Sequence, residues 1–139
     1  MSAHTTYTIP FQVVGRPEEG FHAIMECARE VPFDIKRTFV TTGTPVDVER
    51  GGHAHFNTEM ILIAVNGTIT IATEDRFGHK EEITLGSPAK GIFLPTLCWH
   101  TMRYSVDAIQ LVLASTNYRA EDYIRSYDRY LEICQAYRK

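Results

Sequence analysis

The sequence predicts an all-β domain that ends in one α-helix, and two patterns support this prediction. Short segments rich in β-branched and aromatic residues recur along the chain, separated by turn-forming Gly, Pro and Asn. Many short strands with turns at regular intervals are typical of a β-sandwich or barrel. Near residue 120 the apolar residues change to helical spacing. A chain of 139 residues suffices for one core. We therefore expect a single domain over 1–139, with a barrel over about 5–116 and a helix over about 119–137.

The strands are expected between clear turn signals. Residues 33–42 alternate in the manner of a strand, and a loop rich in Gly, Pro and charge follows at 43–52. Asn66-Gly67 predicts a hairpin, because both central positions of a type I′ turn need positive φ. We expect the other strands over 60–65, 68–73, 82–85, 92–94, 99–104 and 108–114.

The C-terminal segment has the period of an amphipathic helix. Its apolar residues recur at helical spacing, at Tyr123, Ile124, Tyr127, Tyr130, Leu131 and Cys134. Glu121 and Asp122 fall in the expected first turn, where carboxylates favour the helix dipole. We expect this helix to pack on the β-body or on a partner subunit, with tyrosines that serve packing rather than chemistry.

Composition and charge exclude several classes of function. A formal net charge of −3 without a basic run gives no footprint for nucleic acid. No stretch approaches the roughly 18 apolar residues of a membrane span, and residues 1–10 lack the features of a signal peptide. The odd, widely spaced Cys27, Cys98 and Cys134 indicate a reducing compartment rather than a disulfide framework. We expect a cytoplasmic protein with no membrane or nucleic-acid partner.

The most informative feature is the segment Arg50-Gly51-Gly52-His53-Ala54-His55, followed by Glu59. In an extended chain, side chains at i and i+2 point to the same side, so His53 and His55 lie next to each other. Imidazole titrates near neutral pH and also ligates metals. The pair therefore predicts a site that either transfers protons or holds a metal ion.

A second segment completes a two-part pattern. His-x-His-x3-Glu precedes the Asn66-Gly67 turn, and Pro95-x4-His100 follows it. This pattern resembles the signature of the cupin jelly roll, which implies a jelly-roll barrel with these residues inside its mouth. The spacing leaves two readings open. His53, His55, Glu59 and His100 are suitable ligand types for Fe, Mn, Zn or Ni, although metal cupins usually carry glycine where Leu97 stands.

A closer resemblance extends from Val31 to Asp128. The segments that carry it are 31–37, 50–55, 99–102, 112–115 and the block Asp122-Tyr123-Ile124-Arg125-Ser126-Tyr127-Asp128. The chain resembles sugar 3,4-ketoisomerases of bacterial deoxysugar and O-antigen biosynthesis. The resemblance implies a dTDP-4-keto-6-deoxyhexose as substrate, a ketone moved from C4 to C3 through an enediol, no metal or other cofactor, and a homodimer.

Carried over by these motifs, His53 is the catalytic base, which removes the proton on C3. His55 orients this base or shares its proton, and His100 lines the same cavity from the opposite sheet.

Two arginines are natural partners for the diphosphate, because a guanidinium grips phosphate oxygens in bidentate fashion. These are Arg37 and Arg50, and the same motifs imply substrate contacts for the adjacent Lys36 and Gly51.

This sequence departs from the family at the residue that acts as the general acid, which donates a proton to the sugar. Relatives carry a tyrosine suited to proton donation where this chain has Phe39, and usually Arg or Tyr where it has Glu19. Glu19 is expected to supply the acid if burial raises its pKa, with a water molecule as the alternative. Weaker candidates are His22, Tyr7 and Tyr104.

Three other functions remain open at this stage. A C3 or C5 epimerase on a nucleotide-linked sugar needs the same proton abstraction beside a ketone. The others are a metal-dependent cupin and a sugar-nucleotide binding module that has lost its acid. The sequence does not determine the configuration at C4 or the nucleotide base, although His100 favours relatives with a galacto-configured product.

Overall fold

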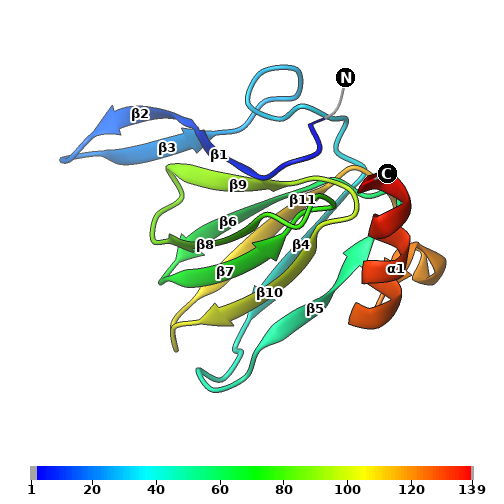
Figure 1. The fold of residues 1–139 in the computed structure, drawn as a ribbon. Helices are drawn as coiled ribbons and strands as arrows, with labels where there is room; N and C mark the ends of the chain where they lie inside the picture. Colours follow the sequence, from blue (N-terminus) through cyan, green and yellow to red (C-terminus); the bar gives the residue numbers. More distant parts are fainter. Residues whose placement is uncertain (1–2, 139) are drawn as a thin grey trace.

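Two five-stranded antiparallel sheets face each other in the computed structural model, which describes residues 3–138 (Figure 1). The first sheet has the order β1 (Tyr7–Pro10), β9 (Lys90–Leu94), β6 (Met60–Asn66), β11 (Ile109–Ala114) and β4 (Arg37–Thr42). The second has the order β12 (Tyr123–Ile124), β5 (Arg50–His55), β10 (Trp99–Tyr104), β7 (Ile69–Glu74) and β8 (Lys80–Leu85). The predicted all-β, cupin-type jelly roll with one C-terminal helix is confirmed.

The inner faces of the two sheets form the main core. The position of β6 in the fold explains why its sequence is apolar at successive positions. Met60 and Leu62 face the interior, whereas Ile61 and Ile63 face outward and are covered by the N-terminal segment. Both faces of β6 are therefore buried, and burying each such side chain stabilises the fold by about 1.5–3 kcal/mol.

The Asn66-Gly67 turn does not form the predicted hairpin. It leads from β6 in one sheet to β7 in the other, so the strands on either side of it are not paired. Only Gly67 of the two residues has positive φ, at 67°. A side chain there would meet Ser105 and Asp107. The Asn66 side chain instead donates a hydrogen bond to the Asp107 carbonyl. The sandwich topology thus replaces the local turn that the dipeptide favours.

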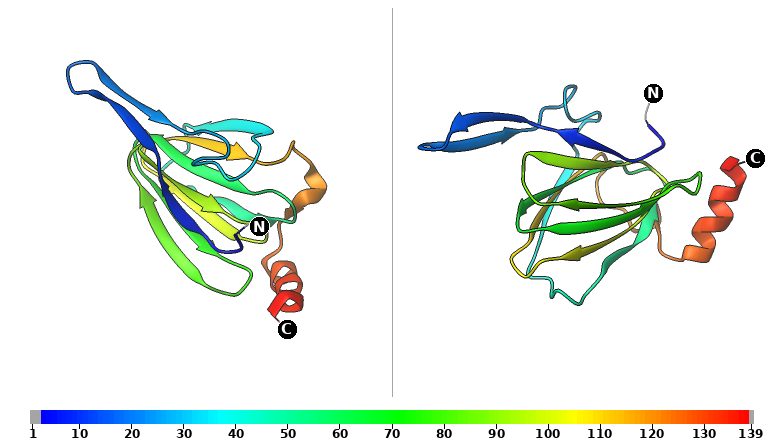
Figure 2. Two further views of the ribbon diagram at one scale, coloured as in Figure 1. Left: turned by 90° about the horizontal axis from the view of Figure 1, so that it is seen from above. Right: turned by 60° about the vertical axis from the view of Figure 1, so that its left-hand side comes forward.

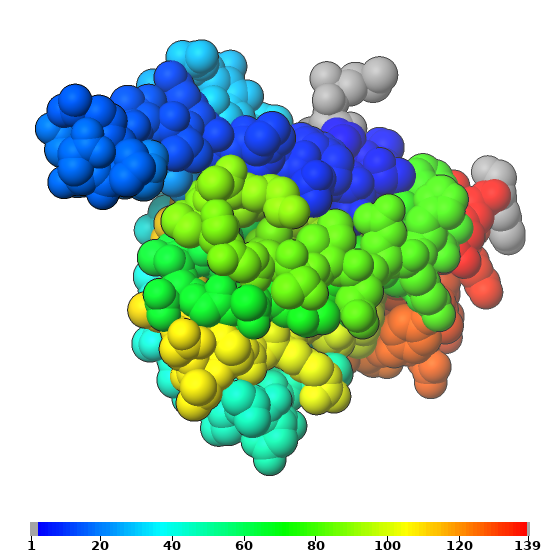
Figure 3. Space-filling view, turned by 90° about the vertical axis from the view of Figure 1, so that its left-hand side faces the viewer, coloured from blue at the N-terminus to red at the C-terminus, as the bar shows by residue number. Residues whose placement is uncertain are grey.

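Within residues 3–138, strands β2 (Gln12–Arg16) and β3 (Gly20–Ile24) pair with each other and with no other strand. The resulting hairpin extends away from the barrel, as both views of Figure 2 and the surface in Figure 3 show. The expectation that the barrel includes the whole range from residue 5 onward is therefore wrong for this hairpin. Three large apolar side chains on it are exposed, namely Val13, Val14 and Phe21.

The C-terminal helix starts later than predicted. Residues Ala120–Asp122 form a short 3-10 turn, Tyr123 and Ile124 form β12, and α1 spans Tyr127–Arg138. The prediction of a helix from about 119 is wrong because β12 pairs with the free edge of β5. Helix α1 then packs against the barrel through fully buried Tyr130 and Cys134.

Most other strand predictions are confirmed within two residues, but β4 begins at Arg37 rather than at residue 33. Within residues 3–138, no helix has the length and apolar character needed to cross a bilayer. The single-domain prediction also covered residues 1, 2 and 139, which lie outside the described part of the chain.

Candidate active site

The pairing of three strands brings four aromatic rings together. Strand β5 lies between β10 and β12, with His53 opposite His100 and His55 opposite Tyr123. The ring centroids of His53 and His100 are 4.8 Å apart, those of His53 and His55 5.1 Å, and those of His55 and Tyr123 4.5 Å. The i, i+2 spacing thus places both β5 histidines beside His100. The prediction that His100 lies on the opposite sheet is wrong, because β10 is the hydrogen-bonded neighbour of β5 in the same sheet. His55 and His100 are each only 3% exposed.

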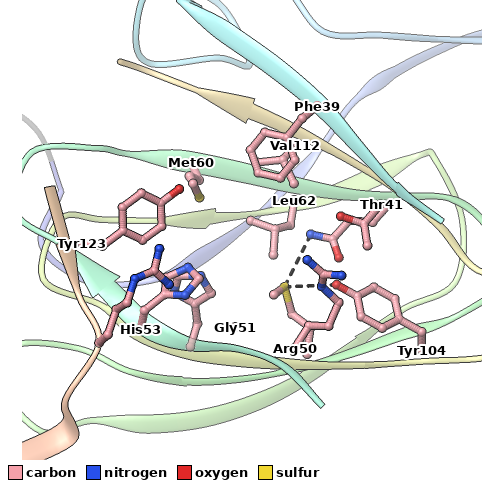
Figure 4. Close-up of a pocket in the computed structure, with 14 residues that line it drawn as sticks. Phe39, Thr41, Arg50, Gly51, His53, Met60, Leu62, Tyr104, Val112 and Tyr123 are labelled. Carbon is pink, nitrogen blue, oxygen red and sulfur yellow. Dashed lines mark hydrogen bonds between the residues drawn. The ribbon is translucent and has the colours of Figure 1, made fainter. Parts of the chain in front are cut away.

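The rings of His53, His100 and Tyr123 line a cavity of about 220 Å³ inside the barrel (Figure 4), and His55 packs behind them. Its apolar wall comes mainly from β4, β6, β10 and β11, through Phe39, Met60, Leu62, Met102 and Val112. Its polar lining consists of Thr41, Arg50, His53, His100, Tyr104, Gln110, Tyr123 and Arg125. In Figure 4, Tyr123 and His53 lie at one end, and Thr41, Arg50 and Tyr104 lie at the other. The volume is smaller than that of pockets for drug-sized ligands, so it suits one part of a larger molecule.

A glycine determines how closely β5 approaches β10. The register shifts between His100 and Thr101, where Gly51 faces Thr101 with a φ of 83°. A Cβ atom at Gly51 would lie 2.6 Å from the His100 carbonyl oxygen. Gly51 therefore allows the bulge beside His100, and it also lines the cavity. The sequence prediction of a substrate contact here is compatible with this position.

The three histidines share an environment that disfavours their charged forms. Burial, followed by the nearby His100 and Arg125, lowers the pKa of His53 from 6.5 to about 3. Burial and the two neighbouring histidines lower the pKa of His55 to about 2. Burial also lowers the pKa of His100. All three rings are therefore neutral at pH 7, and a neutral imidazole can accept a proton.

The ring nitrogens differ in their partners. His100 Nδ1 donates a hydrogen bond to the Cys98 carbonyl at 3.1 Å, so its Nε2 is the acceptor in the neutral ring. His53 Nδ1 and His55 Nε2 are buried and have no hydrogen-bond partner among residues 3–138. Buried polar atoms without partners are costly. Two histidine nitrogens are thus unpartnered within the described residues, and one of them belongs to His53, which lines the cavity.

Three arginines surround the histidines. Arg50 and Arg125 line the cavity, and the Arg125 guanidinium lies 4.4 Å from the centroid of the Tyr123 ring. Arg37, at the start of β4, is close enough to lower the pKa of His55. Its Nε is buried without a hydrogen-bond partner among the described residues. The positive charge around a neutral histidine cluster suits an anionic ligand.

Four predicted site residues do not line this cavity: His55 and Arg37, which lie close to the histidines that do, and Glu19 and Lys36. Glu19 lies in the β2–β3 turn, where its carboxylate is 61% exposed and pairs with Arg16 at 2.5 Å. The prediction of Glu19 as the general acid required its carboxylate to be buried. Because the carboxylate is exposed, the prediction is wrong for this cavity. Lys36 precedes β4 and is exposed. Its backbone N–H donates a hydrogen bond to the Ala114 carbonyl. Strand alternation directs Arg37 inward and Lys36 outward.

The donor set for a metal does not assemble. Burial, followed by the nearby Glu59, raises the pKa of Tyr7, whose ring stacks on Phe93 in the apolar cluster that includes Ile61 and Ile63. Among residues 3–138, no group of three or more His, Cys, Asp or Glu side chains has an arrangement that could hold a metal ion. The four ligands suggested by spacing therefore do not fit one metal site.

Several lining residues were missed by sequence reasoning. Tyr123 and Arg125 fall within the predicted helix, because the apolar residues of their segment recur at helical spacing, although both belong to the block that carries the family resemblance. Tyr104 was considered only as a weak candidate for the acid. Gln110 carried no sequence signal, but it is 2% exposed, and its Oε1 lacks a partner among the described residues. Its Nε2 and the Tyr104 hydroxyl both donate to the Met102 sulfur.

Fold and site together define a jelly-roll protein of the cupin type with an interior small-molecule site. The model of the family described as FdtA, WxcM-like, C-terminal, matches residues 5–135, and the chain belongs to this family. A curated relative, TDP-4-oxo-6-deoxy-alpha-D-glucose-3,4-oxoisomerase from Aneurinibacillus thermoaerophilus, is 39% identical over 103 residues, which is 73% of each chain. The resemblance to sugar 3,4-ketoisomerases is confirmed.

Solved structures agree with this assignment. A 3,4-ketoisomerase from Helicobacter canadensis is 32% identical, with a TM-score of 0.89 over 96% of this chain and 99% of its own. A sugar 3,4-ketoisomerase from Thermoanaerobacterium thermosaccharolyticum in complex with TDP is 31% identical, with a TM-score of 0.89 over 95% and 96%. The rmlC epimerase of Mycobacterium tuberculosis is 15% identical, with a TM-score of 0.75 over 91% and 72%, and shares the fold alone.

Proposed function

We propose that this protein is a sugar 3,4-ketoisomerase that moves the ketone of a dTDP-4-keto-6-deoxyhexose from C4 to C3. The observation that carries the proposal is the pair of neutral histidines, His53 and His55, with unpartnered nitrogens beside a cavity lined by arginines. Family membership supports the same reaction, because the relatives named above are 3,4-ketoisomerases or oxoisomerases.

In the proposed mechanism, His53 removes the proton on C3 of the sugar and an enediol forms between C3 and C4. A general base must be unprotonated and within hydrogen-bond reach of its proton. The lowered pKa of His53 keeps its ring neutral, and its Nδ1 is free of protein partners within residues 3–138. His55 shares or orients the proton from the adjacent position on β5, and His100 supports the site from β10.

The diphosphate is proposed to bind to one or more of the arginines around the histidines, namely Arg37, Arg50 and Arg125. A diphosphate would counteract the positive charges of Arg50 and Arg125, which contribute to lowering the pKa of His53. We therefore expect the pKa of His53 to rise toward neutrality when the substrate binds, which makes the imidazole a stronger base. The nucleotide lies partly outside the small cavity in this proposal, with the hexose inside. TDP as the nucleotide is supported by the complex of the Thermoanaerobacterium relative.

Two alternatives from the sequence are less well supported. A C3 or C5 epimerase shares the proton abstraction, but the epimerase neighbour is distant and shares only the fold. A metal-dependent cupin requires ligands that do not assemble here. We propose that no metal or cofactor is needed, so activity should survive treatment with a chelator. A loss of activity that added Zn²⁺, Fe²⁺ or Mn²⁺ restores would favour the metal alternative.

The oligomeric state, the location and the use of the product are each proposed from fewer observations than the reaction. We propose a homodimer, because Val13, Val14 and Phe21 are exposed on a hairpin that pairs with no other strand of the described chain. A cytoplasmic location is supported by three free cysteines, of which Cys27 is exposed. The product is proposed to supply deoxysugar for bacterial O-antigen and lipopolysaccharide.

The direct test is incubation of the purified protein with dTDP-4-keto-6-deoxyglucose, followed by ¹³C NMR of the product. A ketoisomerase moves the carbonyl signal from C4 to C3. An epimerase leaves the carbonyl at C4 and inverts a neighbouring carbon. A binding module returns the substrate unchanged, while calorimetry with dTDP still shows binding. Either of the last two results would refute the proposed reaction.

A further inference from the structure

We infer that Tyr123 is the proton donor to the sugar carbonyl, in the role that Phe39 leaves unfilled in this chain. This inference rests on the proposed isomerase function. It assigns a catalytic residue to the acid half of the reaction, which the histidines do not supply.

The position of Tyr123 is the first argument. Its ring centroid lies 5.0 Å from that of His53 and 4.5 Å from that of His55. In Figure 4 its hydroxyl is directed into the cavity, toward Met60. A sugar carbon within reach of the His53 ring therefore places its oxygen substituent near this hydroxyl. Base and acid then act on neighbouring atoms of one ring.

The second argument is that the backbone around Tyr123 is held in place. Its strand pairs with β5 at His55. The preceding Asp122 is 7% exposed and accepts hydrogen bonds from the Asn57 backbone N–H at 2.7 Å and from the Thr58 hydroxyl. The Asp122 carbonyl accepts another from the Phe56 N–H at 2.9 Å. These bonds tie β12 to the end of β5, so the phenol and the histidines keep a fixed relation.

The third argument comes from the other candidates. Phe39 lines the cavity without a hydroxyl. The Tyr104 hydroxyl donates to the Met102 sulfur, and in Figure 4 it lies at the end of the cavity opposite His53. Burial raises the pKa of Tyr104 to about 12. Glu19 pairs with Arg16 at the surface. Among the tyrosines that line the cavity, Tyr123 is the one beside the histidines.

The proposed steps balance without a further reactant. His53 takes the proton from C3, the C3–H electron pair forms the C3=C4 bond, and the carbonyl pair moves to O4. O4 takes the proton of the Tyr123 hydroxyl, which gives the enediol, a tyrosinate and an imidazolium. The tyrosinate then removes the proton from O3 as the C3 carbonyl forms, and C4 takes the proton of the imidazolium. Both side chains return to their starting states.

The test compares Tyr123→Phe with Tyr104→Phe, which removes the other cavity phenol. We expect Tyr123→Phe to lower kcat at least ~100-fold, in line with the size of general-acid contributions, with dTDP affinity within threefold of the wild type. Tyr104→Phe should lower kcat less than tenfold. Replacing Tyr123 by the more acidic 3-fluorotyrosine should move the alkaline limb of the pH profile of kcat to lower pH, which a purely structural role would not do.

The outcomes separate this inference from the function it rests on. If the wild type does not isomerise the sugar, the proposed function fails and the role of Tyr123 fails with it. If the wild type is active and Tyr123→Phe keeps kcat within threefold, only the inference about Tyr123 is overturned. Equal losses of kcat in the two phenylalanine variants, or an unmoved alkaline limb, would also overturn it.

Discussion

His53 lies directly opposite His100 in the antiparallel pairing of β5 with β10, and their ring centroids are 4.8 Å apart. This contact links two segments that are far apart in the sequence. It also explains part of the lowered pKa of His53, since His100 is the second cause after burial. The base of the proposed reaction is therefore positioned by its strand and kept neutral by its neighbours.

The variant His53→Asn should lose at least ~100-fold in turnover, because removal of a general base costs this much or more. Binding of dTDP should change less than threefold, since the proposed diphosphate contacts come from arginines. Calorimetry and a product assay measure the two effects. The control is His79→Asn, which alters an exposed histidine paired with Asp75 and should keep full activity. Full activity in His53→Asn would remove this residue from the mechanism.

Gly51→Ala should destabilise the protein more than Gly52→Ala. Both residues have positive φ, so each variant bears the cost of a left-handed conformation, about 1–2 kcal/mol. At Gly51 the new methyl group would also meet the His100 carbonyl at 2.6 Å, whereas nothing lies within 4 Å at Gly52. Urea denaturation measures the difference in the free energy of unfolding. Equal losses in both variants would contradict the close approach of β5 and β10.

Stability should fall as the pH is lowered from about 6.5. The pKa values of His53 and His55 in the folded protein are about 3 and about 2, below the unfolded value of 6.5. The unfolded chain therefore binds more protons than the folded chain between these values, which favours unfolding in acid. Each such histidine contributes up to about 1.4 kcal/mol per pH unit.

The variant His55→Asn separates the contribution of His55 to the pH dependence of stability from that of the Asp and Glu side chains. The free energy of unfolding from urea titrations between pH 5.5 and 4 should decline less steeply in the variant than in the wild type. The expected difference in slope is up to about 1.4 kcal/mol per pH unit. Equal slopes would show that His55 is protonated in the folded protein over this range.

The substitution Phe21→Asp tests the proposed homodimer. If the β2–β3 hairpin packs on a second copy, a carboxylate in place of an exposed phenylalanine should convert a two-chain particle into a one-chain particle. Light scattering after size-exclusion chromatography measures the mass. Val106→Asp is the matched control, because Val106 is 81% exposed in the turn after β10 and lies outside the hairpin. A wild type with the mass of one chain, or a Phe21→Asp variant that remains dimeric, would contradict the proposal.

The sequence predicted those features that depend on local periodicity. The i, i+2 spacing of His53 and His55 predicted neighbouring side chains, and Trp99–Tyr104 was predicted with its correct bounds. The prediction failed where distant segments compete with local preference. Tyr123 has helical spacing to Tyr127 and Tyr130, yet it pairs with β5 because the edge of that strand offers backbone partners. No pattern within residues 119–137 reports such a partner.

The same limit applies to Asn66-Gly67 and to Glu19. The dipeptide favours a hairpin locally, but the arrangement of β6 and β7 in opposite sheets overrides it. The prediction for Glu19 depends on its place in a motif, which gives no information about burial. The structure shows a surface ion pair with Arg16 there. Motifs thus led to the proposed base, whereas the other lining residues required the three-dimensional pairing of strands.

Incorporation of deuterium is the measurement that tests the central claim most directly. The wild type is incubated with dTDP-4-keto-6-deoxyglucose in deuterated water, and the product is analysed by NMR and mass spectrometry. Proton transfer by histidines that exchange with solvent predicts a 3-keto sugar with deuterium at C4. A sugar that keeps its ketone at C4, whether labelled at C3 or C5 or unlabelled, would contradict this account.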